Sequence, residues 1–180
     1  MFPRAPADGQ GMTSRAFVRI AVTSILLGSA SGCGLVSFDV DQDIPAQTVP
    51  GSPLGALLPV SLFAIPMNVD IKSETQGHGT GPASSVTLSS ISLTVTSPTG
   101  ATFEFVDSII INVSAANLPD VEIARLEPVP GTTAISIPPK SGVDLLPYIN
   151  AGATITASAS GHMPASDTTF VGKVVVTVHV

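Results

Sequence analysis

Apolar and polar residues alternate over most of the chain beyond residue 60, and this period of two is typical of β-strands. The alternation begins at Ile65, Met67, Val69 and Ile71, which share one parity. Successive side chains of a strand point to opposite faces, so this segment would have one buried face and one solvated face. We therefore predict a strand over residues 65–72. A turn should follow at residues 75–82, where three glycines and a proline occur.

The next predicted strand contains a change of phase. Its apolar residues occupy even positions up to Leu88 and odd positions from Ile91 onward. This slip at Ser89 and Ser90 predicts a β-bulge within one long strand. The sequence Ser-Pro-Thr-Gly at residues 97–100 has proline and glycine at turn positions, and it predicts a hairpin turn.

Further alternating segments predict the remaining strands, which lie at residues 103–115, around Val121 and Ile123, at 135–137, 153–160 and 173–180. In the last of these, the pattern places Val174, Val176, Val178 and Val180 inward. Residues 143–149 interrupt the alternation and predict one short helical turn. Asp144 can cap this turn, and Pro147 is tolerated so near its beginning.

Seven or eight short strands with turns about every ten residues predict an all-β protein. The expected architecture is an antiparallel β-sandwich, immunoglobulin-like in the broad sense, over residues 60–180. A parallel α/β fold is excluded because the pattern offers no crossover helices.

An acidic and proline-rich segment, residues 33–59, precedes the predicted sandwich. It contains Asp39, Asp41 and Asp43, and four prolines follow before residue 60. Proline removes a backbone donor and favours extended chain, so we predict a semi-stiff tether.

The three aspartates of this segment resemble the first ligands of a calcium loop, because such ligands recur at every second residue. Ile44, however, stands where that loop needs glycine, and Pro50 stands where it needs a glutamate. A solvated acidic patch is therefore favoured, and Asp39, Asp41 and Asp43 are only weak candidates for a metal site.

Residues 15–33 combine two arginines, an apolar run of eight residues, the small residues Ala30, Ser31 and Gly32, and the only cysteine, Cys33. This layout resembles a bacterial lipoprotein export signal of the lipobox type. The apolar run is much shorter than the roughly 20 residues that cross a bilayer. The resemblance implies removal of residues 1–32, with Met12 as an alternative start, and attachment of lipid to Cys33. Ala30 departs from the leucine that is usual at its position.

The body also resembles a known class of proteins. Residues 91–109 and 118–124 are similar in their pattern of strands and turns to uncharacterised exported bacterial lipoproteins with a β-sandwich domain. The resemblance supports the fold and implies no catalytic residues.

Composition excludes one class of partner. The chain has 7 basic and 13 acidic residues and a formal net charge of −6. Nucleic-acid binding depends on a basic surface that neutralises phosphates, so we expect no nucleic-acid partner.

No spacing of reactive residues predicts catalysis. His78, His162 and His179 are far apart in sequence and do not show a metal-ligand spacing. The glycines at residues 77–81 are not followed by the lysine of a phosphate-binding loop, and no Gly-x-Ser-x-Gly elbow occurs. A catalytic triad assembled from distant residues stays open, since triads converge in space rather than in sequence. We expect a protein without enzymatic activity or cofactor.

These patterns together lead to a functional expectation. We expect a lipid-anchored lipoprotein of the cell envelope with a noncatalytic structural or protein-interaction role and an envelope protein as its partner. Gly34 after the cysteine suggests the outer membrane, by analogy with lipoprotein sorting in two-membrane bacteria. The alternative is an envelope module that binds a glycan, a lipid or calcium.

Overall fold

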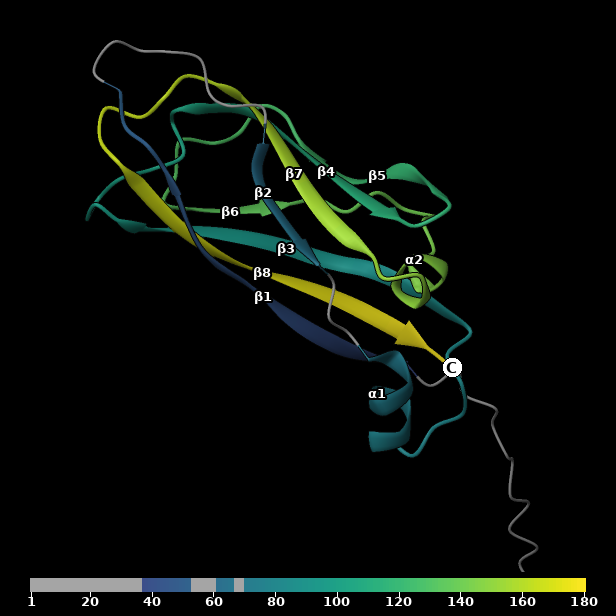
Figure 1. Cartoon of the computed structure of the whole chain (residues 1–180). Coiled ribbons are helices and arrows are strands. Elements are labelled where there is room, and N and C mark those ends of the chain that lie inside the picture. Colours follow the sequence, from purple (N-terminus) through teal and green to yellow (C-terminus); the bar gives the residue numbers. More distant parts are fainter. Residues whose placement is uncertain (1–36, 53–60, 67–69) are drawn as a thin grey trace, which may run out of the picture. The chain divides into compact units, whose positions relative to one another are not determined.

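Eight strands form two four-stranded antiparallel sheets in the computed structural model, which describes residues 37–52, 61–66 and 70–180 (Figure 1). Sheet 1 has the order β1-β8-β3-β6 and comprises Ser37–Val49, Thr168–His179, Ser85–Ser97 and Ala134–Ile137. Sheet 2 has the order β2-β7-β4-β5 and comprises Ser61–Pro66, Thr154–Gly161, Val106–Ala115 and Leu118–Leu126. The predicted all-β antiparallel sandwich is confirmed.

One hydrophobic core fills the space between the sheets, because alternate residues of the strands point into it. In β4 the core residues are Ile109, Ile111 and Val113, and all three are fully buried. Val174, Val176 and Val178 of β8 are also buried, as the alternation predicted, whereas Val180 lies beyond the strand and is half-buried. Among the described residues, Phe103 and Phe170 are the largest fully buried side chains, and they contact each other edge to face, with ring centroids 6.1 Å apart.

The connection after β3 differs from the predicted hairpin. The chain turns at residues 97–100, where Gly100 has a φ of 81°, but β3 pairs with β6 and β8 while β4 belongs to the other sheet. Phe103 and Phe105 lie in this crossover and are buried. Turn residues favour a change of direction, but they do not determine which sheet receives the next strand.

Among the described strands, β4 and β5 are the only consecutive pair that forms a hairpin. Asn117 takes the positive φ that its tight turn requires, at 61°. In every other consecutive pair of described strands, the two strands lie in different sheets. The sandwich is therefore immunoglobulin-like only in the broad sense of two packed antiparallel sheets.

The β-bulge predicted in β3 is confirmed. Leu88 lies opposite Val176, and Ser90 lies opposite Val175, so that Ser89 is the extra residue. The bulge returns the apolar residues of β3 to the core, and Val86 and Ile91 are both fully buried despite their opposite parity.

The strand predicted over residues 65–72 is present at Ile65 and Pro66 and is wrong at residues 70–72. β2 ends at Pro66, residues 67–69 lie outside the described part, and Ile71–Gly77 form the helix α1. Asp70 is its N-cap, and its carboxylate accepts a hydrogen bond from the Ser73 backbone N–H at 3.0 Å. This capping bond satisfies a donor that the first helical turn leaves free, which alternation alone does not register.

The tether predicted over residues 33–59 is also wrong for residues 37–49. These residues form β1, which pairs with β8 along nearly its whole length as the edge strand of sheet 1. Phe38, Val40 and Ile44 face the core, and the intervening aspartates face solvent. Pro45 is accommodated where the register shifts between Ile44 and Gln47, because prolines are tolerated at edges and bulges.

The short helical turn is present as α2, Leu146–Asn150, and begins slightly later than predicted. The Asp144 carboxylate accepts hydrogen bonds from the backbone N–H groups of Leu146 at 3.0 Å and of Val86 at 2.9 Å. It therefore fastens α2 to β3. Tyr148 is buried, and its hydroxyl donates to the Pro119 carbonyl at 3.0 Å.

Candidate functional site

The residues of the predicted lipid signal, Ala30, Ser31, Gly32 and Cys33, lie outside the described residues. The structure shows where the chain that follows Cys33 enters the sandwich. Ser37 begins β1 and lies opposite His179 at the end of β8. The chain therefore enters the domain only four residues after Cys33.

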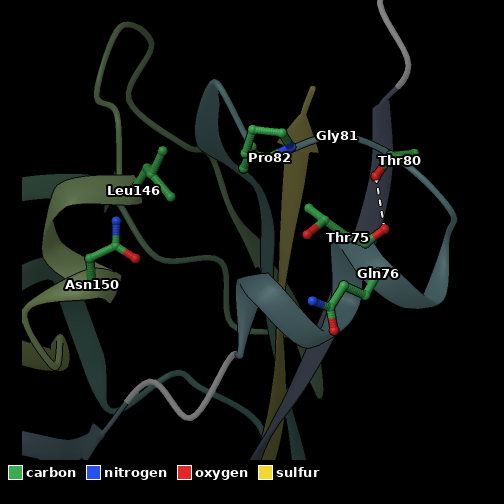
Figure 2. Close-up of a pocket in the computed structure, with 8 residues that line it drawn as sticks. Thr75, Gln76, Thr80, Gly81, Pro82, Leu146 and Asn150 are labelled. Carbon is green, nitrogen blue, oxygen red and sulfur yellow. Dashed lines mark hydrogen bonds between the residues drawn. The ribbon is translucent and has the colours of Figure 1, made fainter.

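One cavity lies between α1 and α2 and has a volume of about 420 Å³. We call it the α1–α2 pocket; it is lined by Thr75, Gln76, Thr80, Gly81, Pro82, Ala83, Leu146 and Asn150. Figure 2 shows the lining residues of the two helices on opposite sides of the cavity. Thr80 shapes its α1 side by donating from both its backbone N–H and its hydroxyl to the Thr75 carbonyl, each at 3.0 Å.

The chemistry of the α1–α2 pocket is neutral. Its lining offers the amides of Gln76 and Asn150 beside the apolar surfaces of Pro82, Ala83 and Leu146, and none of the lining residues that the structure describes is ionisable. The volume falls within the range of small-molecule sites, about 300 to 1,000 Å³. Such a lining can hold an uncharged molecule by packing and hydrogen bonds, but it provides no group for acid or base chemistry.

A second cavity of about 430 Å³ lies at the other end of the strands, beside the crossover from β3 to β4. Glu104, His162 and Ser166 line it, together with the buried Thr168. Within the described part of the chain, the side chains of Glu104, His162 and Ser166 are not hydrogen-bonded to one another. Nucleophilic catalysis needs a nucleophile within reach of an oriented base, so this geometry does not support a triad.

The three aspartates considered for calcium lie on a strand and not in a loop. Asp39, Asp41 and Asp43 occupy alternate positions of β1 and are exposed on the outer face of sheet 1. Two of them have partners on β8: Asp41 pairs with Lys173 at 2.9 Å, and Asp39 accepts a hydrogen bond from the Thr177 hydroxyl at 2.6 Å. Across residues 37–52, 61–66 and 70–180, no group of three metal-ligating side chains is gathered.

Asp41 and Asp43 change the pKa of Lys173. The hydrogen bond to Asp41 and the charge of that carboxylate raise the pKa of Lys173, and the charge of Asp43 adds to the effect. The stabilisation is present below the pKa of an unfolded lysine and is lost as pH rises through the folded value. The acidic patch thus contributes to pairing of β1 with β8.

A second ionic group lies on β5. Arg125 donates to Glu122 from Nη2 at 2.7 Å and from Nε at 3.3 Å, and Lys140 lies 3.9 Å from the same carboxylate. The Arg125 hydrogen bonds, helped by the charges of Arg125 and Lys140, hold the pKa of Glu122 below its ordinary value against some desolvation. The contribution to stability is therefore present when Glu122 is ionised and is lost as pH falls.

The lowered pKa of Glu122 predicts how the stability of a Glu122→Gln variant depends on pH. Above about pH 5, where an unfolded glutamate is ionised, the parent should melt at a higher temperature than the variant. The difference should vanish as pH falls through the lowered pKa of Glu122. Thermal unfolding at a series of pH values measures it, with Glu104→Gln as the control, since Glu104 is exposed and has no ion-pair partner in the described region. A difference that is independent of pH would contradict the assignment.

The three histidines do not converge. His78 follows α1 and stacks on Phe38 with ring centroids 4.0 Å apart, while His179 Nε2 lies 3.2 Å from the Thr87 hydroxyl. His162 lies at the cavity beside the crossover. The glycines at residues 77–81 surround the carboxyl end of α1, which carries partial negative charge and does not favour phosphate.

The α1–α2 pocket was not predicted from the sequence. Its two sides come from segments about 65 residues apart, and α1 itself was taken for a strand and a turn. In the sequence, only Asp70, as a possible N-cap, indicated a helix on the α1 side of the pocket. Among the described residues, no helix has the length and apolar character needed to cross a bilayer. No protein-family model matches the chain, and neither does any curated protein.

Proposed function

We propose that the protein is an exported lipoprotein held in the cell envelope, in the outer membrane, by lipid attached to the Cys33 sulfur. Its β-sandwich serves a noncatalytic structural or protein-interaction role. The observation that carries this proposal is the order of residues 15–33: two arginines, a short apolar run, small residues and a single cysteine.

Two properties of the domain support a noncatalytic role. Among the described residues, the lining of the α1–α2 pocket includes no ionisable side chain, and the cavity beside the crossover has no hydrogen-bonded nucleophile and base. The ion pairs involve exposed or half-buried side chains, and they link β1 to β8, two residues within β5, and β5 to Lys140, which follows β6. These features serve folding, and none assembles reacting groups.

The Cys33→Ser variant tests the anchor. We expect the variant to lose incorporation of labelled fatty acid and either to remain uncleaved or to move to the soluble fraction. Each buried methylene of an acyl chain contributes about 0.8 kcal/mol to membrane binding, so loss of the lipid removes the attachment. Fractionation of the envelope and acyl labelling measure the effect, with Ser31→Ala as a control that keeps a small residue before the cysteine. Unchanged labelling and membrane partitioning in Cys33→Ser would refute the anchor.

A ligand-binding envelope module is the second candidate, and the α1–α2 pocket favours it. The neutral lining suits an uncharged glycan or lipid fragment better than calcium, which requires six to eight oxygen ligands. A ligand that occupies the pocket should raise the melting temperature of the parent. The rise should be smaller in Leu146→Trp, because the larger side chain fills the cavity. An equal rise in both proteins would place binding elsewhere.

A further inference from the structure

The position of Ser37 limits how an anchored domain can sit at a membrane. Ser37 lies opposite His179 in sheet 1, and the Ser84 backbone N–H donates to the His179 carbonyl at 2.7 Å. The chain therefore enters the sandwich at the end that carries α1 and α2 (Figure 1). The α1–α2 pocket lies at this end.

The reach of the connecting chain can be compared with the length of the sheet. Four residue steps separate Cys33 from Ser37, and fully extended chain covers at most about 14 Å over that distance. The twelve residues of β8 span about 36 Å at the rise of an antiparallel strand. A lipid on Cys33 can therefore reach the α1–α2 end of the domain but cannot bring the crossover end to the same membrane surface by the tether alone.

Charged side chains lie both on the sheets and at the α1–α2 end. The outer face of sheet 1 presents Asp39, Asp41 and Asp43 on β1, while the edge strand β5 of sheet 2 carries Glu122 and Arg125. The α1–α2 end exposes the uncharged Pro82, Pro147 and Ala151, together with Gln76 and Asn150, and it also carries the carboxylates of Asp70, Glu74 and Asp144.

Two carboxylates at this end are already engaged by the protein. Those of Asp70 and Asp144 accept hydrogen bonds from backbone N–H groups. Carboxylates on the sheets are engaged as well, Asp41 by Lys173 and Glu122 by Arg125, so the reach of the chain after Cys33, and not the charge, favours the α1–α2 end.

From these observations we infer that the α1–α2 end of the sandwich is the surface that lies against the bilayer, with the crossover end and its Glu104 and His162 projecting away. This inference rests on the proposed lipid anchor at Cys33. It identifies the partner of this end as the lipid headgroup region.

Depth measurements on the lipidated, full-length protein test the orientation. Cys33 is the only cysteine, so once its sulfur carries lipid an introduced cysteine is the only free thiol. A fluorophore would be attached to Gln76→Cys or Ala151→Cys at the α1–α2 end, to Ser92→Cys on the outer face of sheet 1, and to Ser166→Cys at the crossover end. All four positions are exposed. The proteins would be placed in phosphatidylcholine vesicles that carry a nitroxide on the headgroup.

We expect strong quenching at Gln76 and Ala151, weak quenching at Ser92, and none at Ser166. Equal quenching at Gln76 and Ser92 would show a side-on domain and overturn the inference while leaving the anchor intact. Absence of quenching at every position in protein that remains bound to vesicles would also overturn it. Cys33→Ser is measured in parallel, and its continued binding to vesicles would refute the anchor and, with it, the premise of this orientation.

Discussion

Deletion of residues 176–180 should abolish cooperative unfolding. These residues form the end of β8, a central strand that pairs with β1 on one side and β3 on the other. Val176 and Val178 are at most 1% exposed, and full burial of each such side chain contributes about 1.5 to 3 kcal/mol. The deletion would also leave backbone groups of β3 without partners. Because domains are stable by only about 5 to 15 kcal/mol, the combined loss should prevent folding.

Far-ultraviolet circular dichroism during denaturant titration measures this effect, since the chain has no tryptophan and one tyrosine. The matched control is Thr177→Ser combined with His179→Gln, which changes the outward side chains of the same strand. Serine retains a hydroxyl that can donate to Asp39, and the double substitution should cost less than about 1 kcal/mol. A truncated protein that unfolds with the parent's midpoint and slope would show that the terminal residues are not part of the core.

Gly161→Ala should be the most damaging single substitution of a glycine. Gly161 ends β7 with a φ of 147°, and a Cβ atom there would lie 2.2 Å from the Phe105 carbonyl oxygen. The clash is with backbone at the point where His162 N–H also donates to that carbonyl, so relief requires moving the strand end. Strain and overpacking each cost about 1 to 3 kcal/mol, which gives an expected loss of about 2 to 6 kcal/mol.

Gly77→Ala is the control for that experiment. Gly77 is the last residue of α1, and no atom lies within 4 Å of the position that its Cβ would take. Its free energy of unfolding should change by no more than about 0.5 kcal/mol. Denaturant midpoints of the two variants decide the matter, and a Gly161→Ala protein as stable as Gly77→Ala would mean that the two strand ends do not approach as closely as the structure shows.

The sequence predicted the parts of the fold that depend on burial of alternate side chains. The bulge at Ser89 and the inward valines of β8 followed from parity, because a strand that buries one face must keep its apolar residues on that face. The same rule could have revealed β1, where Phe38, Val40 and Ile44 alternate with aspartates. The prolines and charges of that segment outweighed this pattern, although an edge strand tolerates both.

Alternation was misleading where a local cap favoured a helix. Residues 65–71 fit a strand by parity, yet Asp70 satisfies the first turn of α1 and the helix follows. Seven residues are too few for a helical period to stand out against a period of two. The α1 side of the α1–α2 pocket was therefore absent from any expectation based on the sequence.

The sequence by itself determined the all-β class and the inward face of most strands, and it is the basis of the export signal proposed to end at Cys33, because each depends on residues close together in the chain. Only the tertiary structure decided the order of strands, the crossover after β3 and the meeting of α1 with α2. These depend on which apolar faces pack together, and many pairings bury similar areas. The tertiary structure also decided at which end of the sandwich Ser37 lies. This position follows from the pairing of β1 with β8, and the residues around Cys33 do not predict it.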